Sequence, residues 1–143
     1  MARRPASVLF ACNRNAVRSP IAEAIAKRFY GSQMFVDSAG VLPGEPDALA
    51  IAVLAEIGID LSRQRPKTLA EIESDAFDLV VTLTPEAQHR VMELTRTSAF
   101  EMEYWPTYDP AVGEGPRDAL LDAYRLLRDD LIRRVHHRFG QPP

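Results

Sequence analysis

The stretch "VLFACNRNAVRSPIAEAI", residues 8–25, predicts how the fold begins and contains the only cysteine of the chain, Cys12. The apolar run that starts at Val8 is typical of a strand covered on both faces. After a polar loop, Ile21 and Ile25 recur with the period of a helix. The stretch therefore predicts a strand, a loop and a helix in succession, with the cysteine at the end of the strand.

The helix after the loop has typical start and stop signals. Ser19 and Pro20 resemble an N-cap and a first-turn proline, and Gly31 follows the last apolar position. We therefore expect Ser19 to cap this helix and Gly31 to lie just beyond its end.

The rest of the chain repeats this alternation of strand and helix. Residues 34–36, 77–83 and 100–105 are predicted strands, and residues 41–46 and 62–68 are predicted loops. Helices are expected from Pro46 and Asp47 to Gly58, from Pro85 onward, and along a final apolar stripe of Leu120, Tyr124, Leu127, Leu131 and Val135. This order predicts an α/β fold with a parallel sheet and helices on both faces. The length predicts one domain over residues 1–143.

Composition excludes several classes of protein. No apolar run approaches the roughly 20 residues of a membrane span, so we expect no membrane association. The start of the chain does not resemble a signal peptide, which predicts a cytoplasmic protein. A net charge of −3 argues against binding nucleic acid. A single cysteine forms neither an internal disulfide nor a cysteine-rich zinc site, so it serves in packing or by its own reactivity.

Polar side chains collect where the predicted strands end. Cys12 ends the first strand, Ser38 follows the second, Thr82 and Thr84 lie at the end of the third, and Asp109 follows the fourth. Ligands of such sheets bind outside the carboxyl ends of the strands. The sequence therefore predicts a site at this edge.

The loop after the first strand has the features of an anion site. Unpaired backbone N–H groups at the start of a helix attract anions, and Arg18 adds a guanidinium that grips two phosphate oxygens at once. The same positive field stabilises a thiolate at Cys12 beneath the phosphorus. Ser19 is placed to donate a hydrogen bond to the sulfur, and Asn15 tolerates the left-handed backbone that a tight loop requires.

Expulsion of a leaving oxygen also needs a proton donor. The sequence "YDP", residues 108–110, offers Asp109, and Pro110 restricts its backbone to extended conformations. A lone cysteine is most often a small buried apolar residue. Here the register of Cys12 with Arg18 and Ser19, together with Asp109, favours a catalytic role.

Together these motifs resemble the low-molecular-weight protein tyrosine phosphatases. The chain shares the pattern of Cys, five residues, Arg and Ser near its start, followed by "DSAG", "GIDLSRQRPKTL", "FDLVVTL" and "WPTYDP". The resemblance runs over nearly the whole chain and implies one phosphatase domain with a three-layer, flavodoxin-like fold and four parallel strands. It implies a phosphocysteine on Cys12, phosphate binding by Arg18, and Asp109 as general acid and then base. Neither a metal ion nor another cofactor is implied.

In this resemblance the phosphate-binding loop comprises Asn13, Arg14, Asn15, Ala16, Val17 and Arg18. Asn15, Ser19 and Ser38 are expected to support the site, the first and last of them by bracing loops. Arg14 stands where the family usually has glycine, and Val17 where many members have a second cysteine. Arg14 is either a solvated loop residue or a contact to substrate.

The residues expected around the substrate also depart from the family. Ala111 and Val112 follow the Asp-Pro pair, where phosphotyrosine-specific members often have aromatic residues. Gln64 and Lys67 replace a common His and Arg. Trp105 and the neighbouring tyrosines, Tyr104 and Tyr108, belong either to a substrate wall or to the core. The reaction type is therefore better defined than the substrate.

Three functions agree with this pattern. The leading hypothesis is a phosphatase that acts on phosphate monoesters, with a phosphorylated protein, chiefly phosphotyrosine, or a small aryl phosphate as substrate. The first alternative is an arsenate reductase; because Cys12 has no second cysteine to pair with, its second thiol would come from outside the chain. The second alternative is a phosphate-binding module with little catalysis. The sequence does not indicate the oligomeric state.

Overall fold

The computed structural model describes residues 4–96 and 99–143. Four parallel strands form one sheet in the order β2-β1-β3-β4. Their bounds are Ser7–Cys12 for β1, Phe35–Gly40 for β2, Leu79–Thr82 for β3 and Glu101–Tyr104 for β4. This sheet confirms the predicted α/β fold class.

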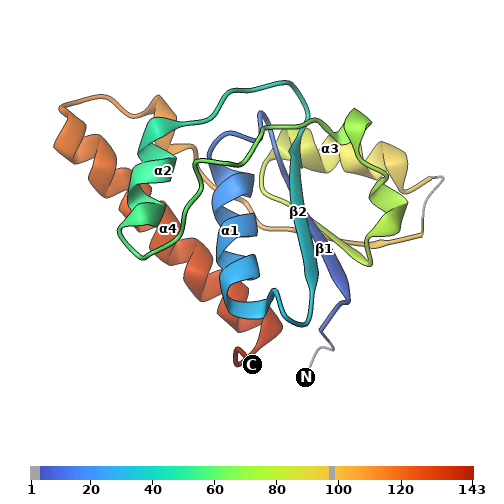
Figure 1. Ribbon diagram of the computed structural model, residues 1–143. Coiled ribbons are helices and arrows are strands. Elements are labelled where there is room, and N and C mark those ends of the chain that lie inside the picture. The colour runs from blue at the N-terminus through green and yellow to red at the C-terminus, as the bar shows by residue number, and fades with distance from the viewer. Residues whose placement is uncertain (1–3, 97–98) are drawn as a thin grey trace.

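Helices cover both faces of the sheet. The α-helices are α1 at Arg18–Tyr30, α2 at Ala48–Ala55, α3 at Pro85–Leu94 and α4 at Arg117–Phe139. Short 3-10 helices occur at Leu69–Glu71, Ser74–Ala76 and Pro110–Val112. In Figure 1, α1, α2 and α4 lie on one side of the sheet and α3 on the other, which gives three layers.

Alternate residues of β1 enter two separate cores. Phe10 and Cys12 pack among residues of α1, α2 and α4, while Leu9 and Ala11 pack beneath α3. Successive side chains of a strand point to opposite faces. Cys12 therefore faces the layer that holds α1, on the same side as Ser38, because Ser38 pairs with Phe10 across the sheet.

Several local predictions were wrong. The first residue of α1 is Arg18 and its N-cap is Val17, so Ser19 lies inside the first turn and its side chain is free for other contacts. Ser38 lies within β2, because that strand continues to Gly40 in register with β1. On α4 the buried stripe begins at Leu121, whereas Leu120 is only half-buried.

Helix α4 holds α2 in place near the carboxyl edge of the sheet. Glu56, just after α2, accepts hydrogen bonds from Arg125 and then Arg128, which lower the pKa of Glu56 to about 2. The buried Tyr124 donates to Asp47 Oδ2 at 2.9 Å, and Asp47 Oδ1 caps the start of α2. Burial, followed by this hydrogen bond, raises the pKa of Tyr124. Tyr124 therefore remains a donor at neutral pH.

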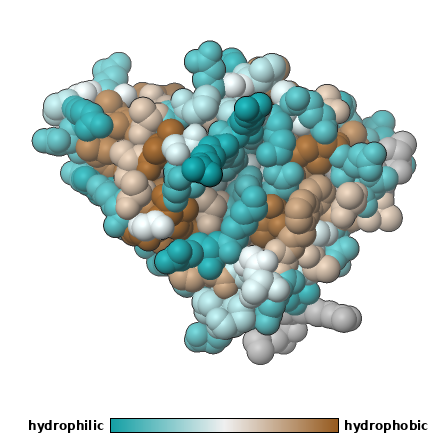
Figure 2. Space-filling view, in the orientation of Figure 1, coloured by the Kyte–Doolittle hydropathy of each residue, from teal (hydrophilic) through white to brown (hydrophobic). Residues whose placement is uncertain are grey.

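Hydrophilic and hydrophobic residues are interspersed over most of the visible surface. Figure 2 shows a band of hydrophilic residues across the middle of the face on which α1 lies. Charged residues of the segment 58–67 and of α1 line a broad depression there. Within residues 4–96 and 99–143, no helix has the combined length and apolarity that crossing a membrane requires.

Candidate active site

The loop between β1 and α1 is held against the end of β2. Backbone N–H groups of Val41 and Leu42 donate to the carbonyl oxygens of Cys12 and Asn13 at 3.0 and 2.8 Å. Gly40 packs so closely on the loop that a Cβ there would lie 2.7 Å from the carbonyl carbon of Arg14. The neighbouring strand therefore fixes the path of the loop.

Asn15 braces the loop from inside. Its φ of 55° is left-handed, as the sequence predicted, and the residue is 1% exposed. Its side-chain Nδ2 donates to Ser19 Oγ at 2.9 Å and to Ser38 Oγ at 2.8 Å, and its Oδ1 accepts from the backbone N–H of Lys67 at 2.9 Å. One amide thus joins α1, β2 and the loop that ends at residue 68.

The sulfur of Cys12 lies next to the Ser19 hydroxyl. Cys12 is 2% exposed, and its Sγ lies 2.9 Å from Ser19 Oγ. Because Asn15 donates to Ser19, the hydroxyl proton of Ser19 is free to point to the sulfur or to the more distant carbonyl oxygen of Ala39 at 3.4 Å. A hydroxyl that donates to the sulfur stabilises negative charge that develops there.

The network continues to a buried carboxylate that the sequence analysis missed. Ser38 Oγ donates to Glu23 Oε1, and Glu23 is 4% exposed. Gln64 Nε2 donates to both Glu23 and Ser38, and Lys27 Nζ lies 2.6 Å from Glu23 Oε2. Glu23 follows Ser19 by four residues on α1 and so shares its buried face. A charged residue four positions after Ser19, on the same helix face, is the sequence signal that could have indicated Glu23.

Arg18 and Asp109 meet across the entrance to the loop. Arg18 Nη1 donates to the carbonyl oxygen of Thr107 at 3.1 Å, and its Nη2 lies 3.8 Å from Asp109 Oδ2. Asp109 Oδ1 accepts from the backbone N–H of Ala111 at 2.9 Å. The side chain of Arg18 is 12% exposed and that of Asp109 is 32% exposed. The carboxyl group therefore reaches solvent, while the guanidinium is fixed.

A cavity of about 190 Å³ opens above the sulfur. It is lined by Cys12, Asn13, Arg14, Ala16, Val17, Arg18, Asp47, Asp109 and Ala111. The predicted nucleophile, clamp and acid thus line one cavity, with Asn15, Ser19 and Ser38 behind its wall. No group of three or more His, Cys, Asp or Glu residues in the described part of the chain could hold a metal ion.

Other predicted residues have different places. Neither Thr82 nor Thr84 lines this cavity. Thr82 Oγ1 donates to the carbonyl oxygen of Glu103, and Thr84 caps α3. Trp105 also lies outside it. Asp47, which the sequence indicated only as a helix start, lines the cavity, and Arg14 both lines it and donates to the carbonyl oxygen of Pro43 at 3.1 Å.

Comparisons with known proteins agree with this geometry. The family model described as low molecular weight phosphotyrosine protein phosphatase matches residues 7–138. An arsenate reductase of Halalkalibacterium halodurans is 33% identical over 90% of this chain and 91% of its own, and a glutaredoxin arsenate reductase of Synechocystis is 30% identical over 91% and 93%. The crystal structure of a low molecular weight protein tyrosine phosphatase from T. tengcongensis is 27% identical, with a TM-score of 0.75 and coverage of 90% and 94%.

Proposed function

The chain belongs to the low-molecular-weight phosphotyrosine protein phosphatase family, whose cysteine-based members include phosphatases and arsenate reductases, and we propose that it is a phosphatase. Its proposed substrates are aryl phosphate monoesters, chiefly phosphotyrosine on a protein. The observation that carries this proposal is the common cavity of Cys12, Arg18 and Asp109. It brings a nucleophile, a planar cation and a carboxyl group to one bound phosphate.

In the first step, the backbone N–H groups of the loop and the guanidinium of Arg18 bind the phosphate oxygens. The Cys12 thiolate attacks phosphorus, so that a sulfur–phosphorus bond forms while the bond to the leaving oxygen breaks. Asp109, in its protonated form, gives its proton to that oxygen. The products are a free alcohol or phenol and a phosphocysteine.

In the second step, the Asp109 carboxylate removes a proton from water, and the water oxygen attacks phosphorus. The sulfur–phosphorus bond breaks, and its electron pair returns to Cys12. The Ser19 hydroxyl, 2.9 Å from the sulfur, donates a hydrogen bond to the departing thiolate. Inorganic phosphate then leaves, and Asp109 is protonated again.

A second candidate function is supported by the names of the relatives, since both curated relatives described above are arsenate reductases. Arsenate would bind in the same loop and form a sulfur–arsenic bond to Cys12 with loss of water. An external thiol would then attack the sulfur, releasing arsenite and leaving a mixed disulfide that a second thiol reduces. The two electrons come from the two external thiols, because Cys12 is the only cysteine of the chain.

Parallel assays of the purified protein separate the two functions. One measures phosphate release from an aryl phosphate without any thiol, and the other measures arsenite formation from arsenate with glutathione and glutaredoxin. Cys12→Ser is the control in both. We expect thiol-independent phosphate release and a phosphorylated Cys12 in samples quenched during turnover. Arsenite formation without phosphate release would refute the phosphatase proposal and favour the reductase.

A further inference from the structure

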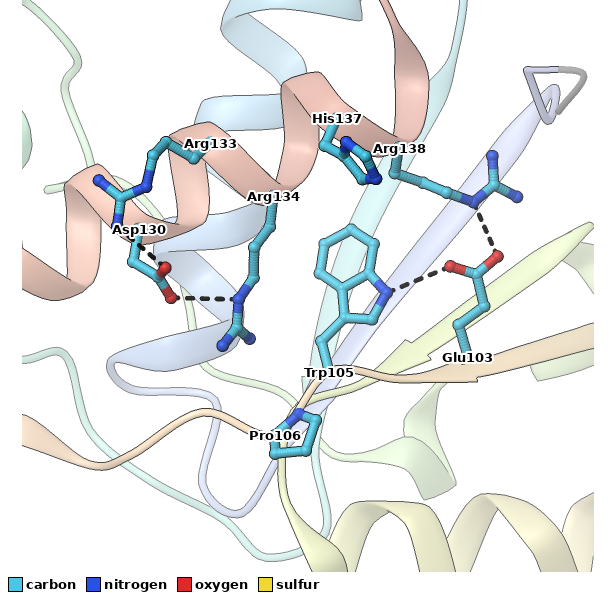
Figure 3. Close-up of a pocket in the computed structure, with 8 residues that line it drawn as sticks. All are labelled: Glu103, Trp105, Pro106, Asp130, Arg133, Arg134, His137 and Arg138. Atoms are coloured by element: carbon cyan, nitrogen blue, oxygen red, sulfur yellow. Dashed lines mark hydrogen bonds and ion pairs between the residues drawn. The ribbon is translucent and has the colours of Figure 1, made fainter. Parts of the chain in front are cut away.

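A second and larger cavity, of about 450 Å³, lies between the end of β4 and the last half of α4. Figure 3 shows its walls: Trp105 and Pro106 come from the strand end, and Asp130, Arg133, Arg134 and His137 from the helix. Its size is within the range of about 300–1,000 Å³ that is usual for small-molecule sites. None of the residues that line the active-site cavity lines this one.

The indole of Trp105 forms a fixed apolar wall of this cavity. Its Nε1–H donates to Glu103 Oε1 at 3.1 Å, and its ring contacts Phe10 edge-to-face at a centroid distance of 5.9 Å. Phe139 packs against it at 6.4 Å. A ring held from two sides offers a preformed surface for another flat ring, which binds without first ordering the wall.

The opposite wall carries an excess of positive charge. Arg133 Nη2 and Arg134 Nε both pair with the single carboxylate of Asp130, each at 3.1 Å. Glu103, the other acidic residue of the lining, pairs with Arg138 at 2.7 Å. Each carboxylate of the lining is therefore already occupied, while the two neighbouring arginines share one anion. Guanidinium groups in this state retain N–H donors for a second anion.

We propose that this cavity is a binding site for a planar aromatic anion, a flat ring that carries a carboxylate or phosphate group. The ring lies against the Trp105 indole, and the anionic group binds Arg133 and Arg134. In Figure 3 the Arg134 side chain extends from α4 toward the strand end, alongside the indole. The proposal does not depend on the reaction at Cys12.

The active site must be excluded as the origin of any signal. Arg134 Nη1 donates to Thr107 Oγ1 at 3.1 Å, and the carbonyl oxygen of Thr107 accepts from Arg18. Thr107 therefore connects Arg18 in the active site to Arg134 in the second cavity, so that a ligand bound above Cys12 also affects the second cavity. Variants at each of the two sites are needed to show where a ligand binds.

The chain supplies its own reporter, because Trp105 is its only tryptophan. Its indole N–H gives a single resonance in a ¹H–¹⁵N spectrum. The test titrates 2-naphthoate into the full chain, with uncharged 2-naphthamide as the matched ligand. We expect 2-naphthoate to shift the indole resonance in a saturable way. We expect 2-naphthamide to bind at least about tenfold more weakly, since a charged hydrogen bond contributes at least this factor.

Arg133→Gln and Arg134→Gln should each weaken 2-naphthoate binding by about tenfold, the loss expected for one charged hydrogen bond. Arg117→Gln, at the start of the same helix, is the matched control and should bind normally, as should the active-site variant Arg18→Lys. Dispersion of the remaining resonances confirms folding. No saturable shift, an equal response to 2-naphthamide, or unchanged binding in both arginine variants would overturn the proposal. Loss of binding in Arg18→Lys alone would assign the ligand to the active site and overturn it too.

Discussion

The two loops that form the active-site cavity differ in how firmly they are held. In the phosphate-binding loop, residues 13–18, Asn15 is 1% exposed and joins three segments of the chain through its side chain. In the acid loop, residues 107–113, Tyr108 is 53% exposed and Val112 is 78% exposed. The first loop is therefore anchored by a buried side chain, whereas much of the second is exposed.

This difference suggests separate roles for the two loops, with catalysis depending on the phosphate-binding loop and the choice of substrate on the acid loop. The nucleophile contacts, through Ser19, a buried hydrogen-bond network that includes Asn15, Ser38 and Glu23, where loss of a side chain disturbs several partners at once. In the acid loop, the carbonyl oxygen of Thr107 accepts a hydrogen bond from Arg18, and the Tyr108 hydroxyl donates to the carbonyl oxygen of Ala123. The Asp109 carboxylate accepts from the backbone N–H of Ala111 within the loop. Substitutions in the phosphate-binding loop should therefore affect every substrate, and those in the acid loop should discriminate among substrates.

Cys12→Ser should have the largest effect. We expect phosphatase turnover to fall by about four orders of magnitude or more, as when the nucleophile of another covalent enzyme is removed. Phosphate binding should persist, because the backbone N–H groups and Arg18 remain. Steady-state kinetics and calorimetric titration with phosphate measure the two quantities. Hydrolysis near the wild-type rate would contradict a covalent intermediate on Cys12.

Arg18→Lys should lower kcat/KM by about a hundredfold to a thousandfold, the usual loss for one preorganised donor at a developing charge. Lysine keeps the charge but cannot grip two oxygens in the plane of a guanidinium. The loss should be the same for all aryl phosphates, because this contact does not involve the leaving group. A mild or substrate-dependent loss would show that Arg18 is not the phosphate clamp.

Asp109→Asn tests the acid loop directly. Asparagine retains an oxygen for the Ala111 N–H but cannot supply a proton. We expect kcat/KM to fall by about a hundredfold for esters with basic leaving oxygens, at the low end of general-acid effects, and far less for activated aryl esters. A series of leaving groups under identical conditions measures the slope. Equal losses along the series would assign the proton donor to another residue.

The fold was largely predictable from the sequence, which also indicated Asn15 and Ser38 as loop braces, but the partners that complete their hydrogen-bond network were not predictable. Alternating strands and helices indicated the parallel sheet, and the spacing of Cys12, Arg18 and Ser19 indicated one loop. Glu23 and the close approach of Gly40 depend on contacts across the sheet and between distant segments. The spacing of Ser19 and Glu23 indicates a shared helix face, but local sequence patterns carry no information on the contacts between distant segments. For the same reason the N-cap preference of Ser19 was misleading, because its hydroxyl bonds within the site instead.

Asn15→Ala measures how firmly the phosphate-binding loop is built. The change removes three hydrogen bonds, leaves the Lys67 N–H without its partner and puts alanine at a positive φ, so the free energy of unfolding should fall by about 2 to 4 kcal/mol. Val112→Ala, the matched truncation in the acid loop, should change it by less than about 0.5 kcal/mol, as usual at exposed sites. Urea denaturation measures both. Similar losses in the two variants would remove the contrast between the loops.

Ala111→Tyr should have the smallest effect and bears on the choice of substrate. Ala111 lines the cavity and is exposed, so a tyrosine there adds the aromatic wall that the sequence lacks after its Asp-Pro pair. An aromatic pair contributes about 0.5 to 1.5 kcal/mol, which predicts a roughly two- to tenfold lower KM for aryl phosphates. The kcat should hardly change, because the backbone N–H of residue 111 still binds Asp109.

Val112→Tyr is the control for this prediction, because it adds the same ring one residue farther along the acid loop and outside the cavity lining. Its KM should match that of the wild type, and neither variant should gain affinity for an alkyl phosphate, which has no ring to stack. Equal gains in affinity for aryl phosphates in both variants would indicate nonspecific binding of aromatic rings to the surface rather than an aromatic wall of the cavity. A fall in kcat for Ala111→Tyr would show that the acid loop positions the chemistry as strictly as the phosphate-binding loop, and the contrast between them would then not hold.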